Sequence, residues 1–123
     1  MLGRLAKLGS LAVAVSVAAL TIAVPSAGAV TTSLTPGFQT VYTGSPATWG
    51  LAWGNSAPYN VTFTYGDGMS WSKSNTSSTS KGLSHTFSYC INTNRTQTLT
   101  VHESGGGTGT ATSTTRVLGA GAC

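Results

Sequence analysis

Apolar and polar residues alternate over short stretches of this chain, and residues 61–65 show the pattern most clearly. The order there is Val-Thr-Phe-Thr-Tyr, so in an extended chain the apolar side chains occupy one face and the hydroxyl groups the other. Gly-Asp-Gly follows at residues 66–68, and these residue types favour a tight turn. The pattern predicts a half-buried strand that ends in this turn.

Similar stretches recur along the chain between turn-forming residues, and each is predicted to be a strand. They are residues 38–42, 48–53, 60–65, 69–73, 81–89, 96–103 and 108–118. The Ser/Thr-rich segment 74–80 is predicted to be a loop or a polar edge strand, and residues 30–37 a partly disordered lead-in or an edge strand. After residue 29, no long segment repeats apolar residues at helical spacing. The sequence therefore predicts an all-β sandwich or barrel of about seven strands.

The side chains predicted to face the core lie on the apolar side of these strands. They are Val41, Trp49, Leu51, Trp53, Val61, Phe63, Tyr65, Phe87, Leu99, Val101 and Val117. Each large buried side chain contributes roughly 1.5–3 kcal/mol, and together they offset only part of the chain entropy lost on folding. We therefore expect a thin core that needs further stabilisation.

The first 29 residues have the three-part plan of a secretory signal peptide. Two basic residues precede the apolar run 10–24, and Pro25 and the small residues 27–29 follow it. As a helix, the run would cover about 22 Å, which is short of the roughly 30 Å hydrocarbon core of a membrane. This favours cleavage after Ala29, although another cleavage site or a retained anchor is left open. We expect a lead-in at 30–36, one domain at 37–123 and no membrane span after cleavage.

The exported part of the chain carries few charges. Its basic residues are Lys73, Lys81, Arg95 and Arg116, and its acidic residues are Asp67 and Glu103, for a formal net charge of +2. Four scattered basic residues make no patch, so nucleic-acid binding is not supported. Solubility is expected to come from hydroxyl and amide groups.

The two cysteines of a secreted chain are expected to pair as one disulfide. If residues 96–103 and 108–118 form a hairpin centred between Gly106 and Gly107, Cys90 and Cys123 face each other at its open end, subject to a bulge or register shift. A link closing this loop contributes about 3–4 kcal/mol in the chain-entropy model. The alternative is a free or intermolecular thiol at the C-terminus.

The strand and turn at Phe63, Tyr65 and Gly66-Asp67-Gly68, followed by His85 and Phe87, resemble the PKD (polycystic kidney disease-type) domain. The resemblance covers about 34–117 and implies an immunoglobulin-like β-sandwich that serves as an extracellular binding or spacer module. Thr64 departs from the Asp usual in the family, and Cys90, Arg95 and Gln97 also depart from its pattern. Because Asp67 can accept backbone N–H bonds in its own turn and His85 can bond that turn, both are expected to be structural.

The chemistry that these residues offer does not indicate an enzyme. The only acids of the exported chain, Asp67 and Glu103, lie at a turn and at a strand end with nothing else to support a glycosidase pair. No Gly-x-Ser-x-Gly elbow supports a hydrolase built on Asp67 and His85. His85 and His102 lack further ligands at zinc spacing, and two carboxylates make a strong calcium site improbable. No catalytic residue, metal or cofactor is predicted.

Aromatic residues supply the candidate binding site. Trp49 and Trp53 share a strand face with Leu51 and are expected to fill the core, whereas Trp71 lies among serines and is the best candidate for ligand contact, joined by Tyr59 and Tyr42. The leading hypothesis is a secreted, monomeric, non-enzymatic PKD-like module that binds an extracellular protein or polysaccharide. The alternatives are a small carbohydrate-binding module that uses exposed aromatics, and a secreted inhibitor or effector that presents loop 92–94 or 74–80.

Overall fold

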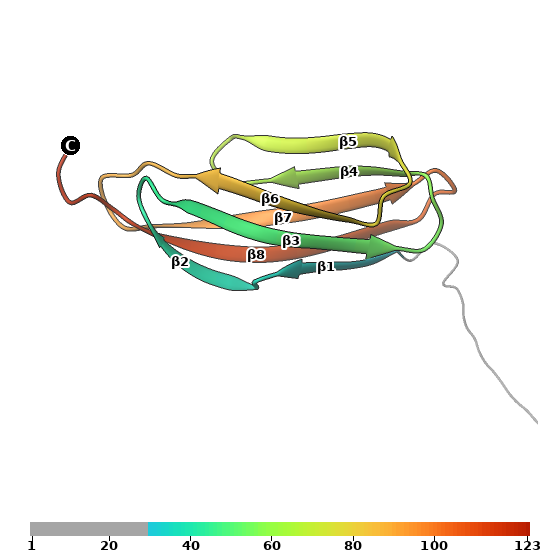
Figure 1. Cartoon of the computed structure of the whole chain (residues 1–123), viewed down its shortest axis with the longest axis horizontal. Coiled ribbons are helices and arrows are strands. Elements are labelled where there is room, and N and C mark those ends of the chain that lie inside the picture. Colours follow the sequence, from blue (N-terminus) through green and yellow to red (C-terminus); the bar gives the residue numbers. More distant parts are fainter. Residues whose placement is uncertain (1–29) are drawn as a thin grey trace, which may run out of the picture.

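The computed structural model describes residues 30–123, and the predicted signal-peptide helix within residues 1–29 lies outside them. The described chain is all-β, without a helix. Its strands are β1 (Thr31–Thr35), β2 (Phe38–Tyr42), β3 (Pro46–Gly54), β4 (Tyr59–Thr64), β5 (Ser70–Thr76), β6 (Ser80–Thr86), β7 (Thr93–Glu103) and β8 (Thr108–Leu118). Figure 1 shows them stacked as two layers that run along the length of the molecule.

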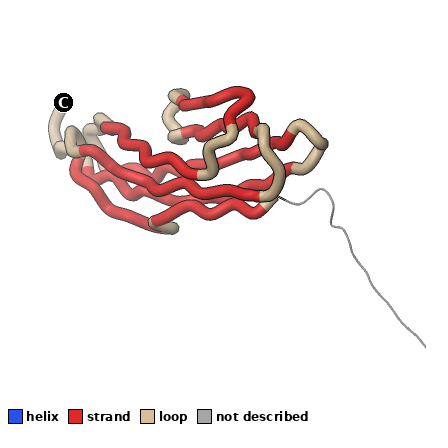
Figure 2. The backbone as a smooth tube through the Cα atoms, turned by 45° about the vertical axis from the view of Figure 1, so that its right-hand side comes forward, coloured by secondary structure: helices blue, strands red, loops and turns tan. Residues whose placement is uncertain are grey.

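The strands form an immunoglobulin-like sandwich of two sheets, which confirms the predicted fold class. One sheet has the order β1-β3-β6 and the other β2-β8-β7-β4-β5. All neighbours are antiparallel except β2 and β8. The connections lie mainly at the ends of the sandwich (Figure 2), as expected for surface loops.

Residues 30–37 and 74–80, for which the sequence allowed either irregular structure or an edge strand, both contribute to edge strands. Within 30–37, β1 pairs along β3 at the edge of the smaller sheet. Within 74–80, β5 extends as far as Thr76, and only residues 77–79 connect it to β6. The structure thus has eight strands where about seven were expected, because β1 is ordered by its pairing with β3.

The core lies between the two sheets, where the alternating apolar side chains meet. Ten of the eleven residues predicted for it are buried, and Val41 is partly buried against it. Trp49 lies at its centre, with its ring centroid 5.4 Å from that of Phe63 and 5.6 Å from that of Tyr65. Tilted aromatic pairs at such distances stabilise a core beyond the area they bury.

The side chain of Gln97 on β7 is fully buried, and its amide nitrogen and oxygen both have hydrogen-bond partners. The Gln97 amide nitrogen donates to the Tyr65 carbonyl at 2.9 Å, and its oxygen accepts from the Thr115 hydroxyl at 2.9 Å. A buried amide left without partners would cost about 1–3 kcal/mol. This network explains how a polar side chain occupies a fully buried position.

The predicted disulfide is present, but the predicted hairpin register is wrong. In the β7–β8 ladder His102 faces Thr108 and Thr93 faces Val117, so the turn is centred on Gly105 rather than between Gly106 and Gly107. Cys90 and Cys123 are nevertheless bonded, with their Cα atoms 5.6 Å apart. The tail beyond β8 makes up the difference, because Gly121 N–H donates to the Cys90 carbonyl at 2.8 Å.

Candidate functional site

The Gly-Asp-Gly turn at residues 66–68 has the conformation that its glycines suggest. Gly66 and Gly68 have φ angles of +89° and +93°, which non-glycine residues rarely adopt. A Cβ atom on Gly66 would lie 2.5 Å from the Thr96 carbonyl oxygen. The first glycine therefore allows β4 to end in close contact with β7.

Asp67 and His85 form the hydrogen bond that the sequence suggested. The Asp67 carboxylate accepts from Met69 N–H at 3.0 Å, and its second oxygen lies 2.6 Å from His85 Nε2. Burial alone would raise the pKa of Asp67, but the hydrogen bonds from His85 and Met69 and the charge of His85 outweigh it, so the pKa lies below its usual value.

The ring of His85 is held by aromatic neighbours as well as by Asp67. It stacks on Tyr65 with centroids 4.1 Å apart and meets Phe87 edge to face at 4.9 Å. Burial, followed by the nearby Asp67 charge, raises the pKa of Tyr65. Every sequence-predicted motif residue therefore belongs to one packed unit that fixes a turn.

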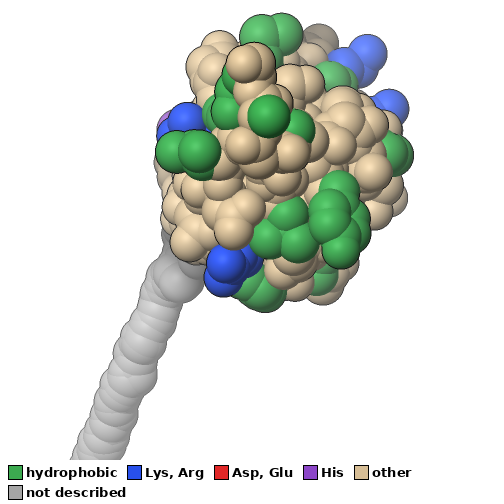
Figure 3. All heavy atoms as spheres, turned by 90° about the vertical axis from the view of Figure 1, so that its left-hand side faces the viewer, with side chains coloured by type: hydrophobic (Ala, Val, Ile, Leu, Met, Phe, Trp, Pro, Cys, Tyr) green, Lys and Arg blue, Asp and Glu red, His purple; other side chains and the backbone are tan. Residues whose placement is uncertain are grey.

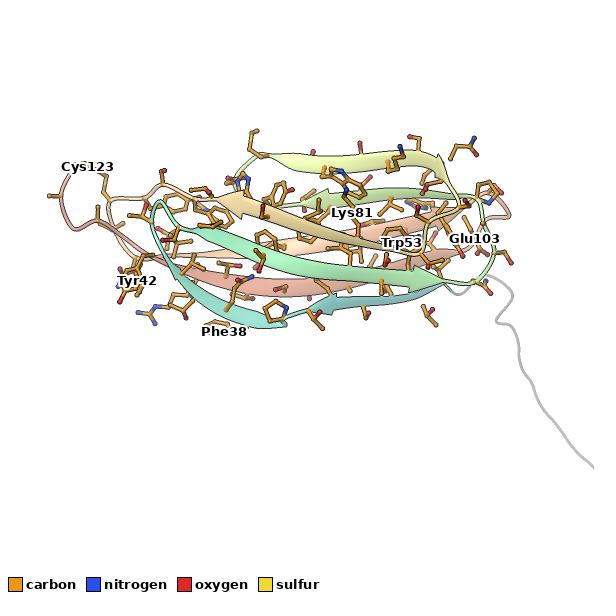
Figure 4. All side chains as sticks on the ribbon, in the orientation of Figure 1. Phe38, Tyr42, Trp53, Lys81, Glu103 and Cys123 are labelled. Carbon is orange, nitrogen blue, oxygen red and sulfur yellow. A yellow bond between two sulfur atoms is a disulfide. The ribbon has the colours of Figure 1, made fainter. Side chains whose placement is uncertain are left out.

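The three aromatics predicted to bind a ligand are not brought together. Tyr59 is 97% buried, with its ring against Trp53 and its hydroxyl accepting from Asn55 N–H at 3.0 Å. This position excludes the predicted surface contact for Tyr59. Tyr42 is exposed, but it lies on β2, away from Trp53 and Lys81 (Figure 4). Only Trp71, which is partly buried on β5, remains beside a hollow of the surface.

That hollow, which we call the Trp71 cleft, opens between the edge strands β5 and β6. Its volume is about 230 Å³. Trp53 and Trp71 supply its aromatic wall, and Lys73 and Lys81 supply its charge. Three hydroxyl groups complete the lining, from Thr76, Ser78 and Ser80.

Strand pairing explains why the two lysines lie on the inner faces of their sheets and line the Trp71 cleft. Lys73 pairs with Val61 of β4, and Lys81 pairs with Leu51 of β3. Because paired residues share a face of the sheet, both lysines lie on the side that faces the opposite sheet. The Lys81 ammonium is held 5.9 Å from the centre of the Trp71 ring, within the range of a cation–π contact.

One residue that lines the Trp71 cleft, Trp53, carries an unpartnered polar atom. The indole nitrogen of Trp53 is buried and has no hydrogen-bond partner among the described residues, and the same holds for Trp49 deeper in the core. Buried indole N–H groups usually find an acceptor. Sequence reasoning missed Trp53, Lys73 and Lys81 as site residues, because a core tryptophan and isolated surface lysines give no local signal of a shared cleft.

Glu103 also has a structural role that the sequence did not reveal. Its carboxylate is buried, accepting from the Asn55 side chain at 3.1 Å and from Ser56 N–H at 3.0 Å. It thus fixes the connection between β3 and β4. Neither acid of the described chain lines the Trp71 cleft, and neither forms an ion pair with its lysines.

Comparison with known proteins gives no family for this chain. The sequence matches no family model and no curated protein. Within residues 30–123, no three His, Cys, Asp or Glu side chains gather as a group able to hold a metal ion. The same residues contain no helix long and apolar enough to cross a membrane.

Proposed function

We propose that this protein is an exported, PKD-like, non-enzymatic module that binds a glycan in the Trp71 cleft. The observation that carries the proposal is the cleft itself, in which a partly buried indole stands beside three hydroxyl groups and two ammonium groups. The C–H faces of a sugar ring pack on an aromatic ring, and its hydroxyls exchange hydrogen bonds with side chains of this kind. Ligand sites commonly combine apolar walls with a few polar groups.

The size of the cleft favours one sugar unit at a time. Its volume of about 230 Å³ is below the roughly 300–1,000 Å³ of pockets that enclose drug-sized ligands. A single ring of a longer chain would enter, while the rest of the chain would lie outside along the edge of the sandwich.

The packed Gly-Asp-Gly turn supports placement with PKD-like domains. Asp67 and His85 bond each other beside a turn whose two glycines adopt positive φ, which gives the motif residues a structural role. The disulfide between Cys90 and Cys123 supports an oxidising, extracellular location, in agreement with the leader-like sequence of residues 1–29.

Two features of the surface make the other hypotheses weaker than glycan binding. The large hydrophobic residues that are exposed are few, with Phe38 and Tyr42 on β2 and Met69 and Ile91 elsewhere. Figure 3 shows hydrophobic side chains in separate patches at the end where the chain terminates, rather than as one docking face. Of the segments considered for an inhibitory loop, residues 74–76 belong to β5, residue 80 to β6 and residues 93–94 to β7, which leaves only short connections. Neither protrudes as a long loop for a partner to recognise.

The proposal is tested by retention on insoluble polysaccharides, with the secreted protein compared with Trp71→Ala and Tyr42→Ala. We expect retention on at least one polysaccharide, loss of it in Trp71→Ala, and no change in Tyr42→Ala, which removes an exposed aromatic outside the cleft. Retention of none of the proteins on any polysaccharide, or equal loss in both variants, would contradict the proposal.

A further inference from the structure

The strongest feature that glycan binding does not by itself explain is the charge of the Trp71 cleft. Of the four basic residues in the described chain, Lys73 and Lys81 both line this one hollow. No Asp or Glu is among its lining residues. Within residues 30–123, Asp67 is committed to His85 and Glu103 to the connection between β3 and β4. Lys73 and Lys81 therefore have no ion-pair partner among the described residues.

Protection of the sheet edges does not account for this arrangement on its own. Both β5 and β6 are edge strands, and charged side chains on edges discourage pairing with other chains. That role is fulfilled by a lysine anywhere along the edge and requires neither a hollow nor an aromatic wall. Here both lysines border the same cleft, and one of them lies over the indole of Trp71.

We propose that the Trp71 cleft recognises an acidic sugar, that is, a ring carrying a carboxylate or a sulfate group. The proposal rests on the proposed glycan-binding function and names its ligand class. The anionic group lies between Lys73 and Lys81, each of which offers N–H donors, and the sugar ring lies against Trp71. The hydroxyls of Ser78 and Ser80 are placed to bond the ring hydroxyls.

The contact between Lys81 and Trp71 gives the binding step an optical signature. In the free protein the ammonium lies 5.9 Å from the ring centre. An anion in the cleft draws this ammonium toward itself and leaves part of the indole face to the sugar. The environment of Trp71 therefore changes on binding, while Trp49 stays buried in the core.

The test is a fluorescence and calorimetric titration of the secreted, disulfide-bonded protein with four soluble polymers. Polygalacturonate presents a sugar carboxylate, dextran sulfate a sugar sulfate, dextran a neutral sugar, and polyglutamate a carboxylate without a sugar. We expect binding to one or both acidic polysaccharides, weaker or no binding to dextran and polyglutamate, and a loss of affinity as salt is raised. The first two polymers show which acidic group is recognised.

Three variants assign the binding to the cleft. Lys73→Gln and Lys81→Gln are each expected to weaken binding by about two- to fivefold, as for partly exposed charge pairs. Arg116→Gln, on the exposed outer side of β8, removes the same charge elsewhere and should leave affinity unchanged. An equal loss of affinity in all three variants would show that binding depends only on the net charge of the protein, and would overturn the proposal.

The remaining outcomes separate the two proposals. Binding to dextran as tight as to the acidic polysaccharides, with dependence on Trp71 but not on the lysines, overturns the acidic-sugar proposal and leaves glycan binding intact. Binding to polyglutamate as tight as to polygalacturonate shows an anion site without sugar recognition, and overturns both. The absence of binding to all four polymers overturns the acidic-sugar proposal, whereas retention on an insoluble neutral polysaccharide would still support glycan binding.

Discussion

Two regions of the sandwich use similar residue types in opposite ways. At one, which we call the pinned end, Asp67 of the Gly-Asp-Gly turn bonds His85, Arg95 bonds the Tyr89 hydroxyl, and a disulfide joins Cys90 to Cys123. At the other, the Trp71 cleft, Lys73 and Lys81 line a hollow that has no acidic residue in its lining. Groups that are satisfied within the protein stabilise it, and groups that are left available can bind something else.

The contrast explains why the most recognisable motif is not the candidate binding site. Asp67 and His85 are a combination that attracts a catalytic interpretation, yet the pair holds a turn and stacks on Tyr65. The lysines of the cleft belong to no motif. The difference between the two regions can be tested by substitutions that affect stability at the pinned end and ligand affinity at the cleft.

The largest effect on stability is expected from removal of the disulfide. A link that closes a loop of 33 residues contributes about 3–4 kcal/mol by restricting the unfolded chain. Cys90→Ser with Cys123→Ser should lower the free energy of unfolding by this amount in urea titrations. At a temperature where the variant stays folded, its affinity for the ligand of the cleft should be unchanged. A loss of affinity in the folded variant would show that the two regions are coupled.

Gly66→Ala should have the next largest effect. The substitution places a Cβ atom 2.5 Å from the Thr96 carbonyl oxygen at a residue with a φ of +89°, so β4 and β7 must separate at this point. A strained residue of this kind costs about 1–3 kcal/mol, which thermal and urea unfolding would measure. Gly68→Ala is the matched control, because it has a similar φ but open space around the added atom. Equal losses in the two variants would assign the cost to φ alone.

The pinned end should also make stability depend on acid pH. In the folded protein the pKa of Asp67 lies below its usual value, which is about 3.9 in an unfolded chain. Its contribution is therefore fully present above about pH 4 and is lost as pH falls through the lower pKa of the folded state. Urea titrations between about pH 2 and pH 6 should show this decline, and Asp67→Asn should flatten it while lowering stability by about 1–2 kcal/mol at neutral pH. An unchanged decline in the variant would assign it to other carboxyl groups.

The pinned end could be predicted well from the sequence because its signals are local. The order Gly-Asp-Gly fixes a turn through backbone conformation, and alternation fixes which side chains of β4 enter the core. The disulfide pairing was also right, although the hairpin register was not. The register depends on the five residues between His102 and Thr108, where Glu103 N–H bonds to the Gly107 carbonyl at 2.8 Å. A glycine-rich turn is compatible with several registers, and the sequence does not choose among them.

The Trp71 cleft could be predicted only in part, because it depends on which edges lie opposite each other. Trp71 was singled out by its polar neighbours, whereas Tyr59, which was expected to join it in contacting a ligand, is buried. Its partner across the ladder is Glu103, and a register shift between Tyr59 and Val61 alters how β4 meets β5. Lys73 is turned toward the hollow by pairing of β5 with β4 in one sheet, and Lys81 by pairing of β6 with β3 in the other. No local pattern encodes how these two sheet edges face each other.

The smallest effect on stability is expected at the cleft, from Lys73→Gln combined with Lys81→Gln. Surface substitutions away from special features usually change stability by no more than about 0.5 kcal/mol, and each lysine is exposed without a carboxylate partner. The contact of Lys81 with Trp71 at 5.9 Å adds little to the stability of the fold, because the site is open to solvent. Urea unfolding of the double variant should therefore match the parent protein.

The matched control for this prediction is Arg95→Gln at the pinned end. Arg95 Nε donates to the Tyr89 hydroxyl at 2.8 Å, and the guanidinium lies 5.0 Å from the centre of the same ring, so its loss should cost about 1–2 kcal/mol. Removal of Arg95, which has partners within the protein, should thus destabilise the protein more than removal of both Lys73 and Lys81. If the two cleft lysines cost as much as Arg95, they are part of the fold's own stabilisation, and the distinction between the pinned end and the Trp71 cleft would no longer hold.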